Sequence, residues 1–294
     1  MNFLVKQAGF SLIELIVVIV LLGVLATGAG MLITTPIKAY NDQLRRQQLV
    51  DQAEMSLRHI ASDIRKALPG TIRISPNNET GGWALEMANT VDGARYRDGG
   101  GGEFNDDDDI LELKSVDTKF NFLGITDTPT PNPLILSGWR LVIYNLDVEN
   151  FYSSVTTGGG GIVTPLDTTL TLSQDGIEQK LEMSPGFKFT KKGNGQRAYF
   201  IDGPISYICD PSSGQTSLVR YSDYEFQLEQ LTTASDFNEL SVPAMSGHVV
   251  TQISACEIAE EIGAGALYTI NMTLDDSKAE AIQILHQVRV LNLP

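Results

Sequence analysis

Residues 8–33 read AGFSLIELIVVIVLLGVLATGAGMLI and contain one charged side chain, that of Glu14. At about 1.5 Å per residue, a helix from Leu15 to Ile33 spans roughly the hydrocarbon core of a bilayer. A secretory signal peptide has a shorter apolar core that ends in a small-residue cleavage site. Here the apolar run passes directly into a polar helical pattern. The stretch therefore predicts a membrane anchor that stays on the mature chain.

The leader, with Lys6 and with Gly9 before Phe10, resembles the class III signal of type IV pilins. The resemblance implies that a prepilin peptidase cuts between Gly9 and Phe10, and that Phe10 becomes the N-methylated first residue. It also implies an assembly role for Glu14, whose carboxylate pairs with the terminal ammonium of a neighbouring subunit. An intramembrane carboxylate costs roughly 2.5 to 3.5 kcal/mol, so it needs a partner or a function. Snorkelling to the interface is the alternative interpretation.

A helical pattern continues beyond Pro36, where we expect a kink or a local opening because proline lacks a backbone donor. Apolar residues follow in steps of three and four, and Pro69 and Gly70 end the pattern. This stripe consists of Ile37, Tyr40, Leu44, Val50, Ala53, Leu57, Ile60, Ile64 and Leu68. We expect one helix from Phe10 to about Leu68, with its second half packed along its own head domain.

After Gly70 the pattern alternates as in strands bounded by Gly, Pro, Asn and Asp. The strand candidates are 71–75, 83–87, 110–113, 139–144, 168–172, 205–209, 217–221, 249–254, 267–274 and 281–291. Because strands follow one long helix, we predict an α+β fold, in which a pilin stem helix packs on a mainly antiparallel sheet. The expected divisions are a leader at 1–9, a transmembrane and stem helix at 10–70, and a periplasmic β-rich head at 71–294.

Several phrases resemble a minor pilin of the mannose-sensitive haemagglutinin (MSHA) pilus. They are AEMSLR at 53–58, DIRKALP at 63–69, TVDGARYR at 90–97, GPISYIC at 203–209, LVRY at 218–221 and HQVRVLNLP at 286–294. This resemblance implies an inner-membrane protein that enters a cell-surface pilus and primes assembly at or near the tip. The implied partners are other major and minor pilins, the prepilin peptidase, the inner-membrane assembly platform and the membrane.

Two other functions remain open. At this length the chain also resembles the J-type minor pseudopilin of type II secretion. A head that acts as a pilus-carried adhesin, binding a glycan or a surface, is the third hypothesis. The formal net charge of -15 argues against a broad phosphate-binding surface, so we expect no nucleic acid partner.

The two cysteines, Cys209 and Cys256, are predicted to form an intrachain disulfide because a periplasmic head lies in an oxidising compartment. Two buried free thiols are the alternative.

An acidic run follows four glycines and consists of Asp106, Asp107, Asp108 and Asp109. Oxygen ligands suit calcium, but the run lacks the glycine and the distal glutamate of a helix-loop-helix calcium site. We therefore prefer a solvated turn and expect no cofactor. The histidines His59, His248 and His286 lack metal-ligand spacing, and no serine lies in a nucleophile-elbow motif. The chain is not expected to be an enzyme.

Overall fold

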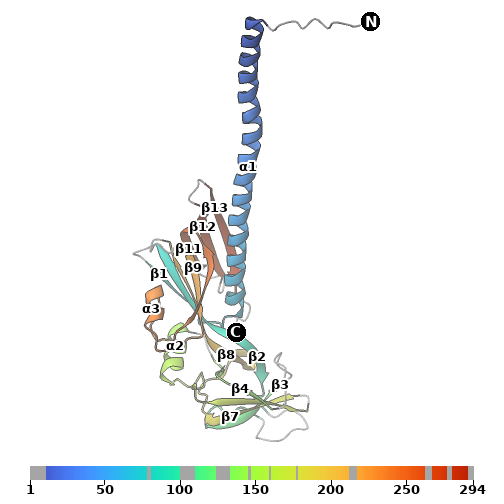
Figure 1. Cartoon of the computed structure of the whole chain (residues 1–294). Helices are drawn as coiled ribbons and strands as arrows, with labels where there is room; N and C mark the ends of the chain where they lie inside the picture. Colours follow the sequence, from blue (N-terminus) through green and yellow to red (C-terminus); the bar gives the residue numbers. More distant parts are fainter. Residues whose placement is uncertain are drawn as a thin grey trace.

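The computed structural model describes residues 11–77, 81–99, 110–123, 133–144, 147–158, 160–176, 178–211, 217–261, 267–276 and 280–290. Within these ranges one long helix precedes a large antiparallel sheet, so the predicted α+β class is confirmed. Figure 1 shows this helix, α1, projecting far beyond a β-rich head. The expected cleavage residues Gly9 and Phe10 and the acidic run 106–109 lie outside the described residues.

The helix α1 extends from Leu12 to Lys66 and contains 55 residues. It continues through Pro36 as a single element, so the expected local opening there is wrong, while the alternative of a kink stays a prediction. The one backbone donor that proline removes leaves the neighbouring turns helical. Ala67 ends the helix and forms an isolated β-bridge with Asn89, which fixes the helix end against the head.

The two halves of α1 differ in burial. We call residues 12–44 the upper stem and residues 49–66 the lower stem. The lower stem buries one face, made of Leu49, Ala53, Ser56, Leu57, Ile60, Ala61 and Ile64. In the upper stem, Ile37, Tyr40 and Leu44 stay 54%, 62% and 40% exposed. The prediction that the head covers the whole apolar stripe is wrong for these three residues, because the head meets α1 only from about Arg45, which pairs with Asp276.

In the described part of the head, the strands form a ten-stranded sheet and a three-stranded sheet. The large sheet consists of β1 (Arg73–Asn77), β2 (Gly82–Tyr96), β3 (Asp117–Leu123), β4 (Leu134–Leu136), β5 (Arg140–Val142), β6 (Thr169–Asp175), β7 (Glu178–Phe187), β8 (Arg197–Asp210), β9 (Ser217–Ser222) and β10 (Met245–Thr251). Its main strand order is β10-β9-β8-β2-β3-β7-β6-β4, while β1 pairs with β2 and β5 with β8. The small sheet, in the order β11 (Ile253–Glu261), β12 (Leu267–Asp275) and β13 (Ala281–Arg289), lies alongside the lower stem (Figure 1). Helices α2 (Val148–Thr157) and α3 (Ala234–Asn238) and the 3-10 turn η2 (Asn194–Gln196) complete the described elements.

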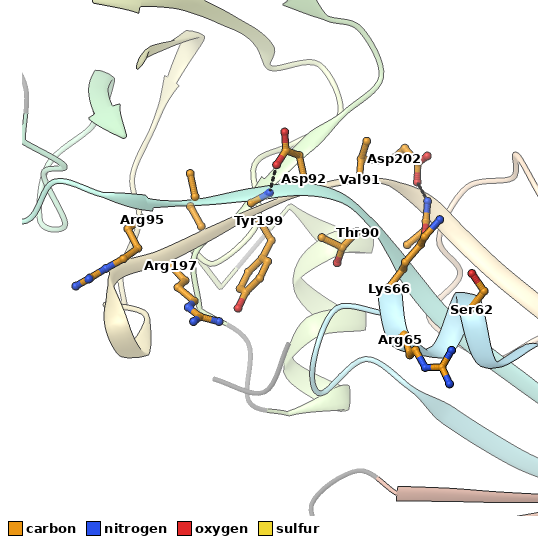
Figure 2. Close-up of a pocket in the computed structure, with 14 residues that line it drawn as sticks. Ser62, Arg65, Lys66, Thr90, Val91, Asp92, Arg95, Arg197, Tyr199 and Asp202 are labelled. Carbon is orange, nitrogen blue, oxygen red and sulfur yellow. Dashed lines mark hydrogen bonds between the residues drawn. The ribbon is translucent and has the colours of Figure 1, made fainter. Parts of the chain in front are cut away.

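Strands β2 and β8 form one long ribbon that joins two hydrophobic cores. The stem core packs the lower stem against Leu85 and Tyr207 of the ribbon. The distal core packs Tyr96 and Phe200, from the other end of the same ribbon, against Phe120 and other residues of β3 to β7. The ribbon's register shifts on either side of Thr90, between the two cores. A cleft lies beside this shift, next to the end of α1 (Figure 2).

Most of the expected strands are present, but their ends differ from the predicted ones. The predicted strand at 110–113 is wrong, because these residues form no strand. Leu111 is buried in the distal core without joining a strand, although its backbone N donates to the Arg97 carbonyl. The next amide, of Glu112, donates to Asp117 Oδ2 at 2.9 Å, which turns the chain toward β3. Strands β3, β4 and β7 and helices α2 and α3 were not expected from the sequence.

Candidate assembly site

The start of α1 is capped by Ser11. Its backbone is extended (φ -76°, ψ 148°), and its Oγ accepts a hydrogen bond from the Glu14 amide at 3.2 Å. The Leu15 amide donates to the Ser11 carbonyl, also at 3.2 Å. A serine side chain at this position satisfies one of the backbone donors that a helix start leaves without a partner. The helix therefore begins directly after the predicted cleavage position.

Glu14 lies in the first turn of α1 with an exposed side chain. Its position three residues after Ser11 matches a capping box, a sequence signal that we overlooked, and in that motif the glutamate accepts from the cap amide. Here only the bond from the Glu14 amide to Ser11 is made. Within the part of the chain that the structure describes, the Glu14 carboxylate has no hydrogen-bond or ion-pair partner. A cation from outside these residues can therefore bind it.

Exposed apolar side chains flank Glu14 and continue along the upper stem. The exposed fractions are 76% for Leu12, 72% for Ile13, 66% for Val24 and 67% for Leu25. Exposed apolar side chains follow one another from Leu12 to Leu25 on successive faces of the helix. A contiguous apolar surface of this kind marks an interaction site in a folded protein.

No helix among the residues described combines the length and the apolar character needed to cross a membrane.

Asp63 fixes the lower stem to the head. Its Oδ2 accepts a hydrogen bond from Tyr207 Oη at 2.7 Å and one from Arg220 Nε at 2.8 Å. Burial, together with the neighbouring Asp63 charge, raises the pKa of Tyr207, so this hydroxyl remains a donor. Both partners come from the ribbon and from β9, more than 140 residues away in sequence. This network holds α1 in one orientation relative to the head.

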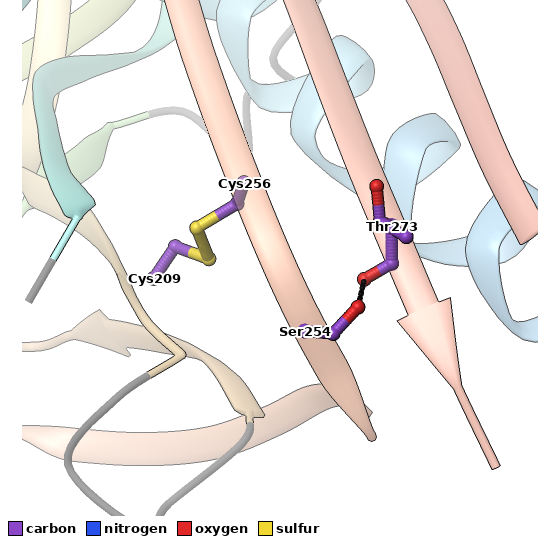
Figure 3. Close-up of a disulfide and its surroundings, with 4 residues drawn as sticks. All are labelled: Cys209, Ser254, Cys256 and Thr273. Carbon is purple, nitrogen blue, oxygen red and sulfur yellow. Dashed lines mark hydrogen bonds between the residues drawn. A yellow bond between two sulfur atoms is a disulfide. The ribbon is translucent and has the colours of Figure 1, made fainter. Parts of the chain in front are cut away.

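The predicted disulfide is present and joins the two sheets. It links Cys209 on β8 to Cys256 on β11, with a Cα–Cα distance of 6.7 Å (Figure 3). Both cysteines are buried in the stem core. On the same strand β11, Ser254 Oγ donates to the Thr273 carbonyl at 3.3 Å. The small sheet is thus attached covalently to the large one at the level of the lower stem.

The three histidines occupy different surroundings. His59 of α1 and His248 of β10 line one shallow cleft together with Arg220, although the sequence separates them widely. His286 lies on β13, and its Nε2 is buried with no hydrogen-bond partner among the described residues. The described ranges hold no cluster of three or more His, Cys, Asp or Glu side chains arranged to bind a metal.

The comparison with protein families matched the start of the chain. Residues 4–30 match the prokaryotic N-terminal methylation motif, which is a type IV pilin-like prepilin signal. The matched segment contains the expected cleavage residues, Ser11, Glu14 and the first part of the upper stem. No curated protein and no solved structure matches the chain. The motif supports a structural role as a pilin or pseudopilin, processed by a prepilin peptidase and anchored in a membrane before it reaches a filament.

Proposed function

We propose that this chain is a minor pilin of an MSHA-like type IV pilus, placed at or near the filament tip, where it primes assembly. The main support is the prepilin signal at 4–30. It leads into helix α1, whose first turn exposes the Glu14 carboxylate, without a partner in the described chain, among exposed apolar side chains. In this proposal the apolar upper stem holds the processed chain in the inner membrane, and the head lies in the periplasm. Assembly then transfers the upper stem from lipid to a bundle of neighbouring stems.

Pairing between charges explains why leader removal permits assembly. Cutting between Gly9 and Phe10 creates a terminal ammonium one residue before the Ser11 cap. The Glu14 carboxylate of one subunit can then pair with the ammonium of the next. In a low-dielectric bundle this attraction is strong, and each charge left alone carries a large desolvation cost. The pair therefore favours one axial register between adjacent stems.

The exposed part of the apolar stripe adds a second contact surface. Ile37, Tyr40 and Leu44 lie above the head and are not covered by it. Burying such side chains stabilises an interface by about 25 cal/mol for each Å² of apolar area removed from water. Neighbouring stems would cover these residues in a filament. This interpretation gives the upper stem two functions, since it carries both the charge pair and the apolar contact.

A J-type pseudopilin of type II secretion is the second candidate, because the same prepilin motif supports both classes.

An adhesin head receives less support. The cleft bounded by α2 and residues 223–226 contains two aromatic residues. Both rings pack against other side chains of the head and offer no open ring face to a ligand. Tyr224 is 5% exposed, and Phe226 stacks edge to face on Phe151. Glycan-binding sites usually present an aromatic face to the ligand.

Deletion of the gene in its source bacterium separates the three functions. For a priming minor pilin, we expect pili to be lost while the major subunit is still processed and stored in the membrane. Electron microscopy measures pilus number, and intact mass measures processing. Normal pili with defective surface attachment would favour the adhesin. Normal pili with retained secretion substrates in the periplasm would favour the pseudopilin.

A further inference from the structure

A cationic cleft lies where α1 ends beside the register shift of the β2–β8 ribbon. Its volume is about 820 Å³. Figure 2 shows Arg65 and Lys66 entering it from α1, Arg95 from β2 and Arg197 from β8. All four cations have exposed side chains. The pairing of the ribbon omits Val91 and Asp202 at this point, so each strand carries one unpaired residue beside the cleft.

The two carboxylates of the cleft accept hydrogen bonds from uncharged donors. Asp92 accepts from the Gly93 amide at 2.7 Å, and Asp202 accepts from Asn89 Nδ2 at 2.9 Å. Arg95 donates its Nε to the Gly195 carbonyl at 3.1 Å. Arg65, Lys66 and Arg197 have no carboxylate within ion-pair distance among the described residues. The cleft is therefore a local positive site on a chain whose formal net charge is -15.

Two hydroxyl groups in the wall of the cleft also lack partners. Thr90 Oγ1 and Tyr199 Oη are buried, and no hydrogen-bond partner for either lies in the described residues. In Figure 2 both side chains lie on the same side of the ribbon as Arg65 and Arg197. Buried hydroxyls without partners destabilise the protein. The groups that a ligand in the cleft can reach are therefore its four exposed cations.

We propose that this cleft binds a carboxylate-rich loop of a neighbouring filament subunit. Guanidinium groups bind carboxylates in a fixed planar geometry, and lysine adds a point charge. A short loop enters the cleft without approaching the rest of the acidic surface. A long polyanion such as nucleic acid would extend beyond the cleft and meet that surface, which repels it. The identity of the partner as a filament subunit rests on the proposed function, whereas binding of an acidic peptide does not.

Fluorescence anisotropy with a labelled synthetic peptide tests this assignment on the full chain in detergent micelles. The peptide carries four consecutive aspartates between glycines, and its counterpart carries asparagines. We expect the aspartate peptide to bind at low salt, the asparagine peptide not to bind, and affinity to fall as ionic strength rises. The double variant Lys66→Gln/Arg197→Gln should bind at least about tenfold more weakly.

Arg46→Gln is the matched control, because Arg46 is an exposed stem cation outside the cleft. Retained binding in this variant supports the cleft assignment. Equal losses in the control and the double variant, or no binding of the aspartate peptide by the wild type, would overturn it. Displacement of the peptide by millimolar inorganic phosphate, or by single-stranded DNA at lower concentration than by unlabelled peptide, would also overturn the assignment to acidic loops. If gene deletion leaves pili intact while the peptide still binds at the cleft, the proposed function fails and the binding site stands.

Discussion

The upper and lower stems belong to one helix but have opposite environments. In the lower stem, Ile60 and Ile64 are fully buried against the head, and Asp63 is held by two hydrogen bonds. In the upper stem, Leu12 and Leu25 are largely exposed and the Glu14 carboxylate is unpaired in the described chain. The lower stem has completed its contacts within the subunit. The upper stem has not, and in the proposed function lipid or other subunits complete its contacts.

The largest expected effect is loss of leader cleavage when the residue before the predicted cleavage position is changed. Gly9→Val should abolish processing, because a side chain at this position obstructs approach of the peptidase to the backbone. Intact mass of the membrane protein measures it, and we expect only the unprocessed chain. Gly23→Ala is the control, since a Cβ at Gly23 meets no atom within 4 Å in the subunit. Normal trimming of Gly9→Val would refute the assigned cleavage position.

A pair of truncations in the two halves of α1 sharpens the comparison. Ile60→Ala removes a fully buried side chain and should lower the free energy of unfolding by about 2–5 kcal/mol. Leu44→Ala removes a side chain that is 40% exposed and should change the free energy of unfolding by only about 0.5 kcal/mol. Denaturant titration in detergent measures both variants. Similar losses in the two would show that the upper stem also packs on its own head.

The disulfide should stabilise the head beside the lower stem. Cys209 and Cys256 are 47 positions apart, for which the chain-entropy estimate gives about 4 kcal/mol as an upper value. We expect Cys209→Ala/Cys256→Ala to lower the melting temperature and to leave leader cleavage unchanged. Alkylation under non-reducing denaturing conditions, followed by mass spectrometry, tests the bond itself. Two reactive thiols in protein from the periplasm would contradict it.

A smaller effect on stability comes from Glu86 of β2, whose side chain is fully buried beside Arg73 and Tyr152. Burial raises its pKa to about 7, although Arg73, at 3.0 Å, acts in the opposite direction. Because the folded-state pKa lies above the unfolded value, this contribution to stability is complete at acidic pH and is lost as pH rises through about 7. Glu86→Gln should flatten that decline in denaturant titrations between about pH 5 and 8. Glu182→Gln, at an exposed site, is the control, and an unchanged slope in Glu86→Gln would contradict the assignment.

The stem could be predicted from sequence because its signals are local. The apolar run, the steps of three and four residues, and Pro69 locate α1 closely. The position along α1 at which the head begins to bury the helix could not be predicted, since it depends on where distant strands meet the helix. Ile37 and Ile60 have the same pattern in the sequence and opposite environments in the structure.

The head was predicted less completely. In β3, the alternation of Phe120 and Phe122 was a usable signal that we overlooked. In α2, Asp147 and Gly158 provide the cap and the left-handed stop, but serine and threonine in between weaken the helical pattern. The cationic cleft had no local signal, because it combines α1 with a register shift of two strands that are separated by about 100 residues. Only the folded ribbon brings those cations together.

The most direct measurement of the central claim compares Glu14→Val with Glu54→Val in pili sheared from cells. Glu54 is an exposed lower-stem carboxylate paired with Arg58, so the second variant removes a charge outside the assembly segment. Quantitative mass spectrometry measures the subunit's share in pili and in membranes, and whether Phe10 is the methylated first residue. We predict that Glu14→Val is processed normally but enters pili about a hundredfold less, since an unpaired buried ammonium costs about 3 kcal/mol or more. Incorporation of Glu14→Val at the level of Glu54→Val and wild type would contradict the claim that this carboxylate directs assembly.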